Sequence, residues 1–123
     1  MAFSLDEIKK LIDPIYRVTG VEGIVIATSD GLPLMSSLGD REQEEKVAAL
    51  TAVLSEVGNR TSQELGKGEA EWITINTAEG AGILLVKLED IGYMAILFNR
   101  DTKLGVLLYT VRDIRKRIQK LVK

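Results

Sequence analysis

The chain has 123 residues, 46% of them hydrophobic and 28% charged, and this composition predicts one soluble globular domain over residues 1–123. With neither cysteine nor histidine it lacks the usual zinc ligands, a thiolate nucleophile and a serine–histidine catalytic pair, so we expect no metal, no cofactor and no catalytic residue. The net charge of −2, the charged start and the lack of a membrane-length apolar run predict a cytoplasmic protein without nucleic-acid binding, a signal peptide or integral membrane association.

The first predicted helix begins with Ser4 and Glu7, which fit a capping box, and Phe3 is placed to pack onto Ile8. Apolar residues then recur at helical spacing. Pro14 lies inside this pattern and predicts a kink or a restart of the helix. Gly20 suits the position just past the helix end.

Five strands are predicted, at residues 23–28, 32–36, 69–76, 81–88 and 92–98. The first, fourth and fifth are apolar without alternation, which indicates that both faces of the sheet are covered. Pro33 cannot donate a ladder hydrogen bond, so the second strand should lie at an edge. Pairing the first strand with the fifth avoids an exposed apolar edge. With strands numbered along the chain, we predict a five-stranded antiparallel sheet in the order 2-1-5-4-3.

A long helical pattern, residues 40–65, separates the two groups of strands, and Asp40 is its candidate N-cap. One stripe of this helix is apolar, and we interpret it as the core face: Val47, Leu50, Leu54, Val57, Thr61 and Leu65. A second stripe carries small side chains that would let another backbone approach closely: Ala48, Ala52, Ser55, Asn59 and Ser62. A third face is predicted to be solvated: Ala49, Glu56, Arg60 and Gln63.

The small stripe has two interpretations that the pattern alone leaves open, because a residue pattern cannot name its partner. It could lie against the same helix of a second copy, or it could fit under a neighbouring loop. The strand at 69–76 follows directly, lacks proline and should form the other edge of the sheet, where a second copy could pair with it. We therefore predict a homodimer with a continuous ten-stranded sheet. Its predicted interface is Ala48, Ala52, Ser55, Asn59, Ser62, Glu71, Trp72, Ile73 and Ile75.

The last predicted helix, residues 104–121, is basic towards its end. The basic side chains are Arg112, Arg115, Lys116, Arg117, Lys120 and Lys123, with Asp113 opposing them. Such a face could contact an acidic partner, a membrane surface or a nucleic acid. We favour a solvated face whose charges suit the negative helix end, because the protein as a whole is mildly acidic.

The hairpin at residues 21–34, VEGIVIATSDGLPL, resembles the first hairpin of the roadblock / dynein light-chain family. Residues 64–66 and 104–108 fit the same family, and the element order matches from about Ser4 to Leu121. The resemblance implies an α/β domain of order αββαβββα, with the middle helix on one sheet face and the other two helices on the opposite face. It also implies dimerisation through the middle helix and the strand after it, giving the ten-stranded sheet.

The resemblance further implies a homodimeric regulator or scaffold that binds a Ras-like small GTPase, and it implies no active site in the domain itself. Bacterial motility-polarity members of this family stimulate GTP hydrolysis by positioning the GTPase's own residues. The residues expected to contact the GTPase are Ala49, Glu56, Arg60 and Gln63. An arginine finger from Arg60 or Arg100 is an alternative that the resemblance argues against.

Two other functions are considered beside this one. The first is a structural adaptor or motor-associated light chain with no effect on GTP turnover. The second is a small-molecule sensor, against which the continuous apolar strands argue because they leave no polar pocket.

Overall fold

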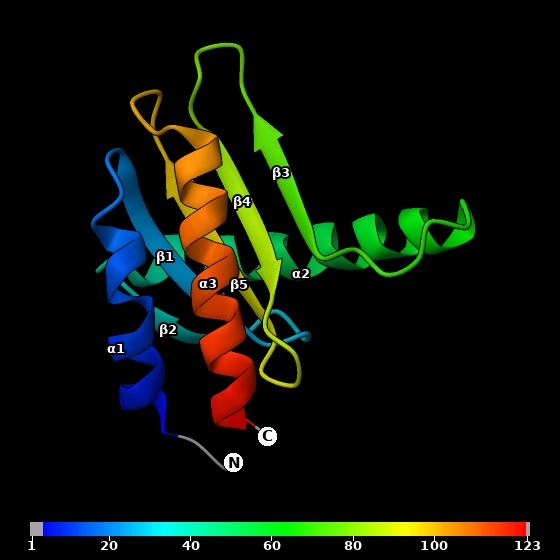
Figure 1. The fold of residues 1–123 in the computed structure, drawn as a ribbon, viewed down its shortest axis with the longest axis horizontal. Coiled ribbons are helices and arrows are strands. Elements are labelled where there is room, and N and C mark those ends of the chain that lie inside the picture. The colour runs from blue at the N-terminus through cyan, green and yellow to red at the C-terminus, as the bar shows by residue number, and fades with distance from the viewer. Residues whose placement is uncertain (1–3, 123) are drawn as a thin grey trace.

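The computed structural model describes residues 4–122, and the packing expected of Phe3 lies outside them. The elements in chain order are α1 (Leu5–Tyr16), β1 (Val21–Ala27), β2 (Pro33–Ser36), α2 (Arg41–Glu64), β3 (Trp72–Asn76), β4 (Gly82–Lys87), β5 (Tyr93–Phe98) and α3 (Leu104–Val122) (Figure 1). The predicted element order is therefore confirmed.

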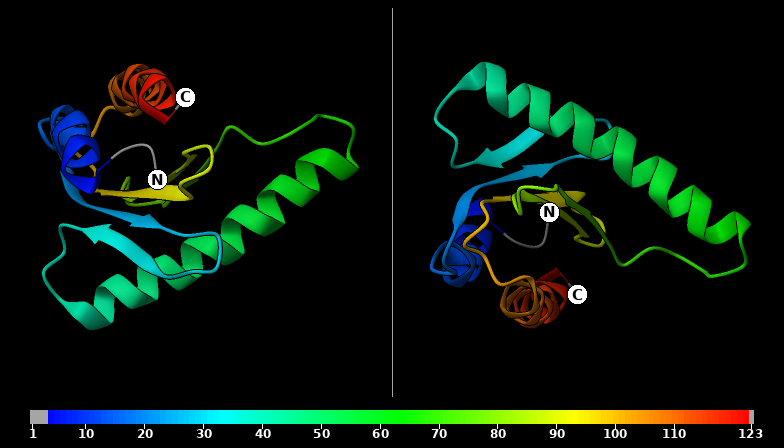
Figure 2. Two further views of the ribbon diagram at one scale, coloured as in Figure 1. Left: turned by 90° about the horizontal axis from the view of Figure 1, so that it is seen from below. Right: turned by 90° about the horizontal axis from the view of Figure 1, so that it is seen from above.

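The five strands form one antiparallel sheet in the order β2-β1-β5-β4-β3, as predicted. α1 and α3 lie side by side on one face, and α2 crosses the other face (Figure 2). The central strands β1, β5 and β4 are covered on both sides, which accounts for their continuous apolar sequences. β2 and β3 are the two edges.

Local signals set the ends of α1 as expected. The backbone N–H of Glu7 donates to the Ser4 hydroxyl oxygen at 3.2 Å. α1 continues through Pro14 to Tyr16 without a restart, because a proline so close to the helix end disturbs only the last turn. Gly20 has a φ of 88°, a conformation that favours glycine, and a Cβ atom there would collide with Thr102.

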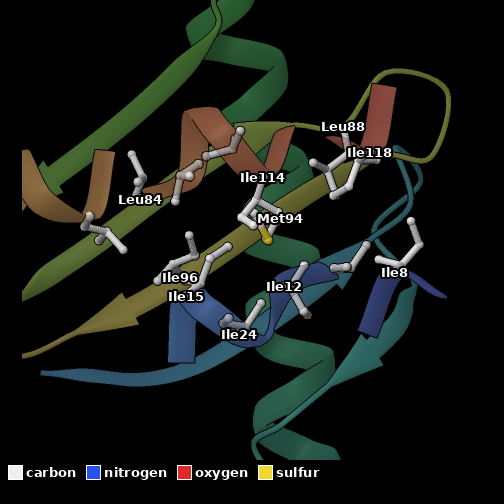
Figure 3. Close-up of a cluster of buried hydrophobic side chains, with 14 of the residues drawn as sticks. Ile8, Ile12, Ile15, Ile24, Leu84, Leu88, Met94, Ile96, Ile114 and Ile118 are labelled. Carbon is white, nitrogen blue, oxygen red and sulfur yellow. The ribbon is translucent and has the colours of Figure 1, made fainter. Parts of the chain in front are cut away.

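The main core lies between the sheet and the α1–α3 layer (Figure 3). It consists of large aliphatic side chains, among them Ile8, Ile12, Ile15, Ile24, Leu84, Met94, Ile96, Ile114 and Ile118. A smaller cluster on the opposite face joins Val25 and Ala27 to Ala48 of α2. Because its members are mostly short, the backbone of α2 lies close to the sheet.

The core face predicted for α2 is wrong. Leu50, Val57 and Leu65 are 54%, 58% and 70% exposed, and Ala48 and Ser55 of the small stripe are buried instead. The β1–β2 turn explains this, since Gly31 lies so close to α2 that a Cβ there would be 3.4 Å from the Cα of Ala49. Of the two interpretations left open, the structure shows the second for this part of the stripe: small residues let the chain's own turn and sheet approach.

α2 is much longer than the sheet is wide. Its 24 residues span about 36 Å at 1.5 Å per residue. Five strands spaced by 4.8 Å cover only about 19 Å. The last turns of α2 consequently extend past β3, clear of the sheet (Figures 1 and 2).

Candidate functional site

An apolar surface lies exposed along α2. Leu50, Val53 and Val57 are 54%, 58% and 58% exposed, and Leu54 beside them is half-buried. At 100° per residue these four side chains fall on one face of the helix. We call this set, Leu50, Val53, Leu54 and Val57, the α2 stripe.

The edge strand β3 lies next to the C-terminal half of α2. Gly58 packs so closely on Ile73 that a Cβ there would collide with the Ile73 side chain. Ile75 points to the same sheet face because side chains alternate along a strand, and it is 40% exposed. β3 pairs with β4 on one side, and within residues 4–122 no strand lies along its other side.

Two residues predicted at the interface make contacts on the α3 side. Trp72 packs against the main core, and the Arg112 guanidinium lies 5.4 Å from the centre of its ring. Arg115 donates hydrogen bonds to the Glu71 carboxylate at 2.7 Å and to the backbone oxygen of Lys87 at 3.0 Å. Both predicted residues are thus engaged within their own chain.

The neighbouring ion pair joins Glu69, just before β3, to Lys87 at the end of β4. The hydrogen bond from the Lys87 ammonium, together with its charge, lowers the pKa of the Glu69 carboxyl below its ordinary value. The same hydrogen bond raises the pKa of Lys87, against a smaller opposite effect of its partial burial. This pair holds the entry to β3 in place.

Ala48 and Ser55, predicted at the dimer interface, are covered by their own chain at 0% and 1% exposure. They leave no surface for a second chain, because the sheet lies directly over them. Ala52, Asn59 and Ser62 are half-buried. The Asn59 amide oxygen accepts from the Ala70 N–H at 2.8 Å, which ties α2 to the segment leading into β3.

The four residues predicted to contact a GTPase are all exposed on one side of α2. Glu56, Arg60 and Gln63 line a groove of about 330 Å³. Ala49 lines a separate hollow, also bordered by Leu32 and Pro33 of the β1–β2 hairpin. The hairpin turn, which rests on α2 at Gly31, lies between the two.

Leu32 is a surface residue that the sequence analysis missed. It is 62% exposed at the hairpin turn, next to the predicted contact residues. A large aliphatic residue directly after the turn glycine is the signal that could have found it, since turns are usually built from small and polar residues.

Other site chemistry is sparse in the described part of the chain. Between residues 4 and 122, no group of three or more acidic side chains is placed to hold a metal ion. Over the same residues, none of the helices is long and apolar enough to span a membrane. The features that stand out are therefore surfaces: the α2 stripe with the β3 edge, and the polar side of α2 beside the hairpin.

Residues 7–98 match the family model of the Roadblock/LC7 domain. The chain belongs to the Roadblock/LC7 domain family. Its fold is similar to a Roadblock/LC7 domain from Streptomyces avermitilis (TM-score 0.81, 20% identity, 98% of each chain). It is also similar to MglB of Myxococcus xanthus (TM-score 0.84, 13% identity, 98% of each chain). Among curated proteins, Uncharacterized protein MJ0714 of Methanocaldococcus jannaschii is 25% identical over 112 residues, 91% of this chain and 93% of the relative.

The match to the Roadblock/LC7 model ends at Phe98, the last residue of β5. The two structural comparisons extend over 98% of the chain and so include most of α3. α3 of this Roadblock/LC7 domain thus shares the fold of its relatives while lying outside the matched part of the family model.

Proposed function

We propose that this Roadblock/LC7 domain pairs with a second copy and that the homodimer binds a Ras-like small GTPase as a regulator or scaffold. The observation that carries the proposal is the α2 stripe, exposed on a helix that extends past an unpaired edge strand. A second copy related by a twofold axis beside β3 would cover both features. Its α2 would lie beside the α2 stripe, and its β3 would complete the ladder.

The revised interface consists of the α2 stripe together with Ile73 and Ile75. Leu50, Val53 and Val57 are each about half exposed, so covering each would contribute roughly 1 kcal/mol, or roughly 6 kcal/mol for a pair of copies. Association costs about 4–15 kcal/mol in lost freedom of movement. The apolar stripe alone therefore offsets only the lower part of this range, and the backbone hydrogen bonds between two β3 edges add to it in the proposed dimer.

The polar side of α2 would stay accessible in this dimer, because Glu56, Arg60 and Gln63 lie on a different side of the helix from the α2 stripe. Together with Ala49 and Leu32 they offer a surface of mixed polarity for the GTPase. Such a platform regulates by surface complementarity, holding the GTPase's own catalytic residues in position. This role follows the family resemblance, and the local geometry is compatible with it.

The dimer is tested by solution mass. Sedimentation equilibrium at micromolar concentration should give twice the subunit mass for the wild type and one subunit mass for Val57→Asp, because the new carboxylate would be buried in the pair. Val106→Asp is the matched control, since Val106 is 51% exposed on α3, and it should remain dimeric. A folded wild-type protein that sediments as a single subunit contradicts the proposed dimer.

The GTPase partner is tested by binding and turnover. We expect a Ras-like GTPase from the same organism to bind the wild type, and Arg60→Glu to weaken that binding while leaving the dimer mass unchanged. Arg100→Ala should leave GTP turnover unaltered, which separates positioning from an arginine finger. Binding without any change in turnover would favour the adaptor function. No binding in either nucleotide state would reject the GTPase part of the proposal.

A further inference from the structure

The outer side of α3 combines exposed apolar and basic side chains. Val106 and Tyr109 are 51% and 79% exposed near the start of the helix. Arg112, Lys116 and Lys120 follow at intervals of four residues, and all three are exposed. At 100° per residue these five side chains share one face of the helix, and we call them the α3 outer face. Asp113 lies on the same face, and its charge is paired with Arg117.

The ion pairs of α3 involve other residues. Arg115 contacts Glu71 and Glu89, and Arg117 pairs with Asp113 one turn earlier. Within residues 4–122, Lys116 and Lys120 form no salt bridge, and Arg112 stacks over Trp72. The charges of Lys116 and Lys120 are therefore free to meet a partner outside the molecule.

The helices α2 and α3, on opposite faces of the sheet, carry opposite net charge. α3 contains five basic residues and one acidic residue, whereas α2 contains three basic and five acidic residues. Because α2 and α3 lie on opposite faces of the sheet (Figure 2), a negatively charged surface would attract the α3 side and repel the α2 side.

We propose that the α3 outer face binds a membrane surface that contains anionic lipids. The five side chains run along about 21 Å of helix, and an array of separated charges suits lipid headgroups that can move to meet them. Tyrosine beside aliphatic residues and lysines is the combination that sits at the headgroup level of a bilayer. Lys9 and Lys10 of the adjacent α1 are also exposed, but Asp6, Glu7 and Asp13 are exposed on the same helix, so the positive charge on this side comes from α3.

In this orientation the polar side of α2, with Glu56, Arg60 and Gln63, faces the aqueous side. In the proposed homodimer a twofold axis normal to the sheet would turn both α3 helices towards the same membrane and double the contact. That doubling rests on the proposed function, whereas binding by one copy does not. The proposal thus changes the interpretation of this helix from a solvated face to a peripheral membrane contact.

The test is co-sedimentation of the whole chain with phosphatidylcholine vesicles, with and without phosphatidylserine. Binding should require phosphatidylserine and should fall as salt is raised, because salt screens exposed charges. The double variant Lys116→Gln and Lys120→Gln keeps the Arg112–Trp72 contact and should bind roughly tenfold or more weakly. Tyr109→Ser should also weaken binding while leaving the salt dependence unchanged.

The matched control is Lys46→Gln with Lys67→Gln, which removes the same charge at α2 and just beyond it. This control should bind vesicles as the wild type does. The proposal is overturned if the control variant loses as much vesicle binding as the double lysine variant, or if the wild type binds equally to vesicles with and without phosphatidylserine. It is also overturned if the protein binds an acidic peptide or duplex DNA but neither kind of vesicle. Solution mass and GTP turnover are measured without vesicles, so a failure here is distinct from a failure of the proposed dimer or GTPase partner.

Discussion

Arg115 of α3 donates a 2.7 Å hydrogen bond to Glu71, the residue immediately before the edge strand β3. The same guanidinium donates to the backbone oxygen of Lys87 at the end of β4, and its side chain is only 16% exposed. The position of the free edge is thus fixed from the opposite face of the sheet. The start of β3 is thereby tied to α3.

Arg115→Ala is expected to lower the free energy of unfolding by about 1–3 kcal/mol, since hydrogen bonds to charged groups are among the stronger ones. Urea denaturation followed by circular dichroism measures this change. Arg117→Ala is the control, because its pair with Asp113 is exposed on both sides and should contribute less than about 0.5 kcal/mol. Equal losses in the two variants would show that Arg115 makes no special contribution.

The Glu69–Lys87 pair predicts a dependence of stability on pH. The pKa of Glu69 is lowered in the folded protein, so its contribution is complete above the unfolded pKa and is lost as pH falls through the folded pKa. Glu69→Gln should therefore be less stable than the wild type at pH 7, and the difference should close as pH falls through the folded pKa of Glu69. The pKa of Lys87 is raised, so its contribution persists at neutral pH and is lost only in strong base. A stability difference between the wild type and Glu69→Gln that grows as pH falls would contradict the lowered pKa of Glu69.

Ser55→Ala is expected to leave stability unchanged or to raise it by up to about 1 kcal/mol. The Ser55 hydroxyl is buried with no hydrogen-bond partner among the described residues, so its removal takes away a desolvation cost. The reverse change at a matched position, Ala48→Ser, buries a new hydroxyl two turns earlier and should cost about 1–3 kcal/mol. Thermal unfolding of both variants tests the pair, and a destabilised Ser55→Ala would indicate a partner for this hydroxyl.

Two glycines should respond to alanine in opposite directions. A Cβ at Gly82 would collide with the backbone oxygen of Ile75 and lie 2.8 Å from the Phe98 ring, so Gly82→Ala should cost about 1–3 kcal/mol or more. Gly105 in the first turn of α3 has no atom within 4 Å of its Cβ position. Gly105→Ala should therefore stabilise by up to about 1 kcal/mol through helix propensity. Chemical denaturation of the two single variants distinguishes them, and equal effects would contradict the packing at Gly82.

The fold could be predicted because its signals are local and agree with one another. Pro33 marked one edge of the sheet, and the unbroken apolar sequence of β5 required neighbours on both sides. Those two facts determine most of the strand order. The capping residues Ser4 and Asp40 likewise depend only on residues a few positions away.

The orientation of α2 could not be predicted in the same way. Periodicity shows that Leu50 and Val57 share a stripe, but it does not show which stripe faces the chain's own sheet. The close approach of Gly31 to α2 decides this, and it depends on a hairpin whose position is fixed only in three dimensions. The pairing of Arg115 with Glu71, 44 residues apart, is equally invisible to local patterns.

The last turns of α2 lie beyond the sheet, and Arg60, Thr61, Gln63 and Glu64 are exposed there. In a lone subunit these turns depend on the intrinsic tendency to form a helix, which is marginal for short segments in water. Their backbone amide protons should therefore exchange quickly in dilute solution and slowly at concentrations at which the proposed dimer forms. The end of this helix would then fold together with dimerisation. The protection of its amide protons from exchange would report the fraction of subunits that are dimeric.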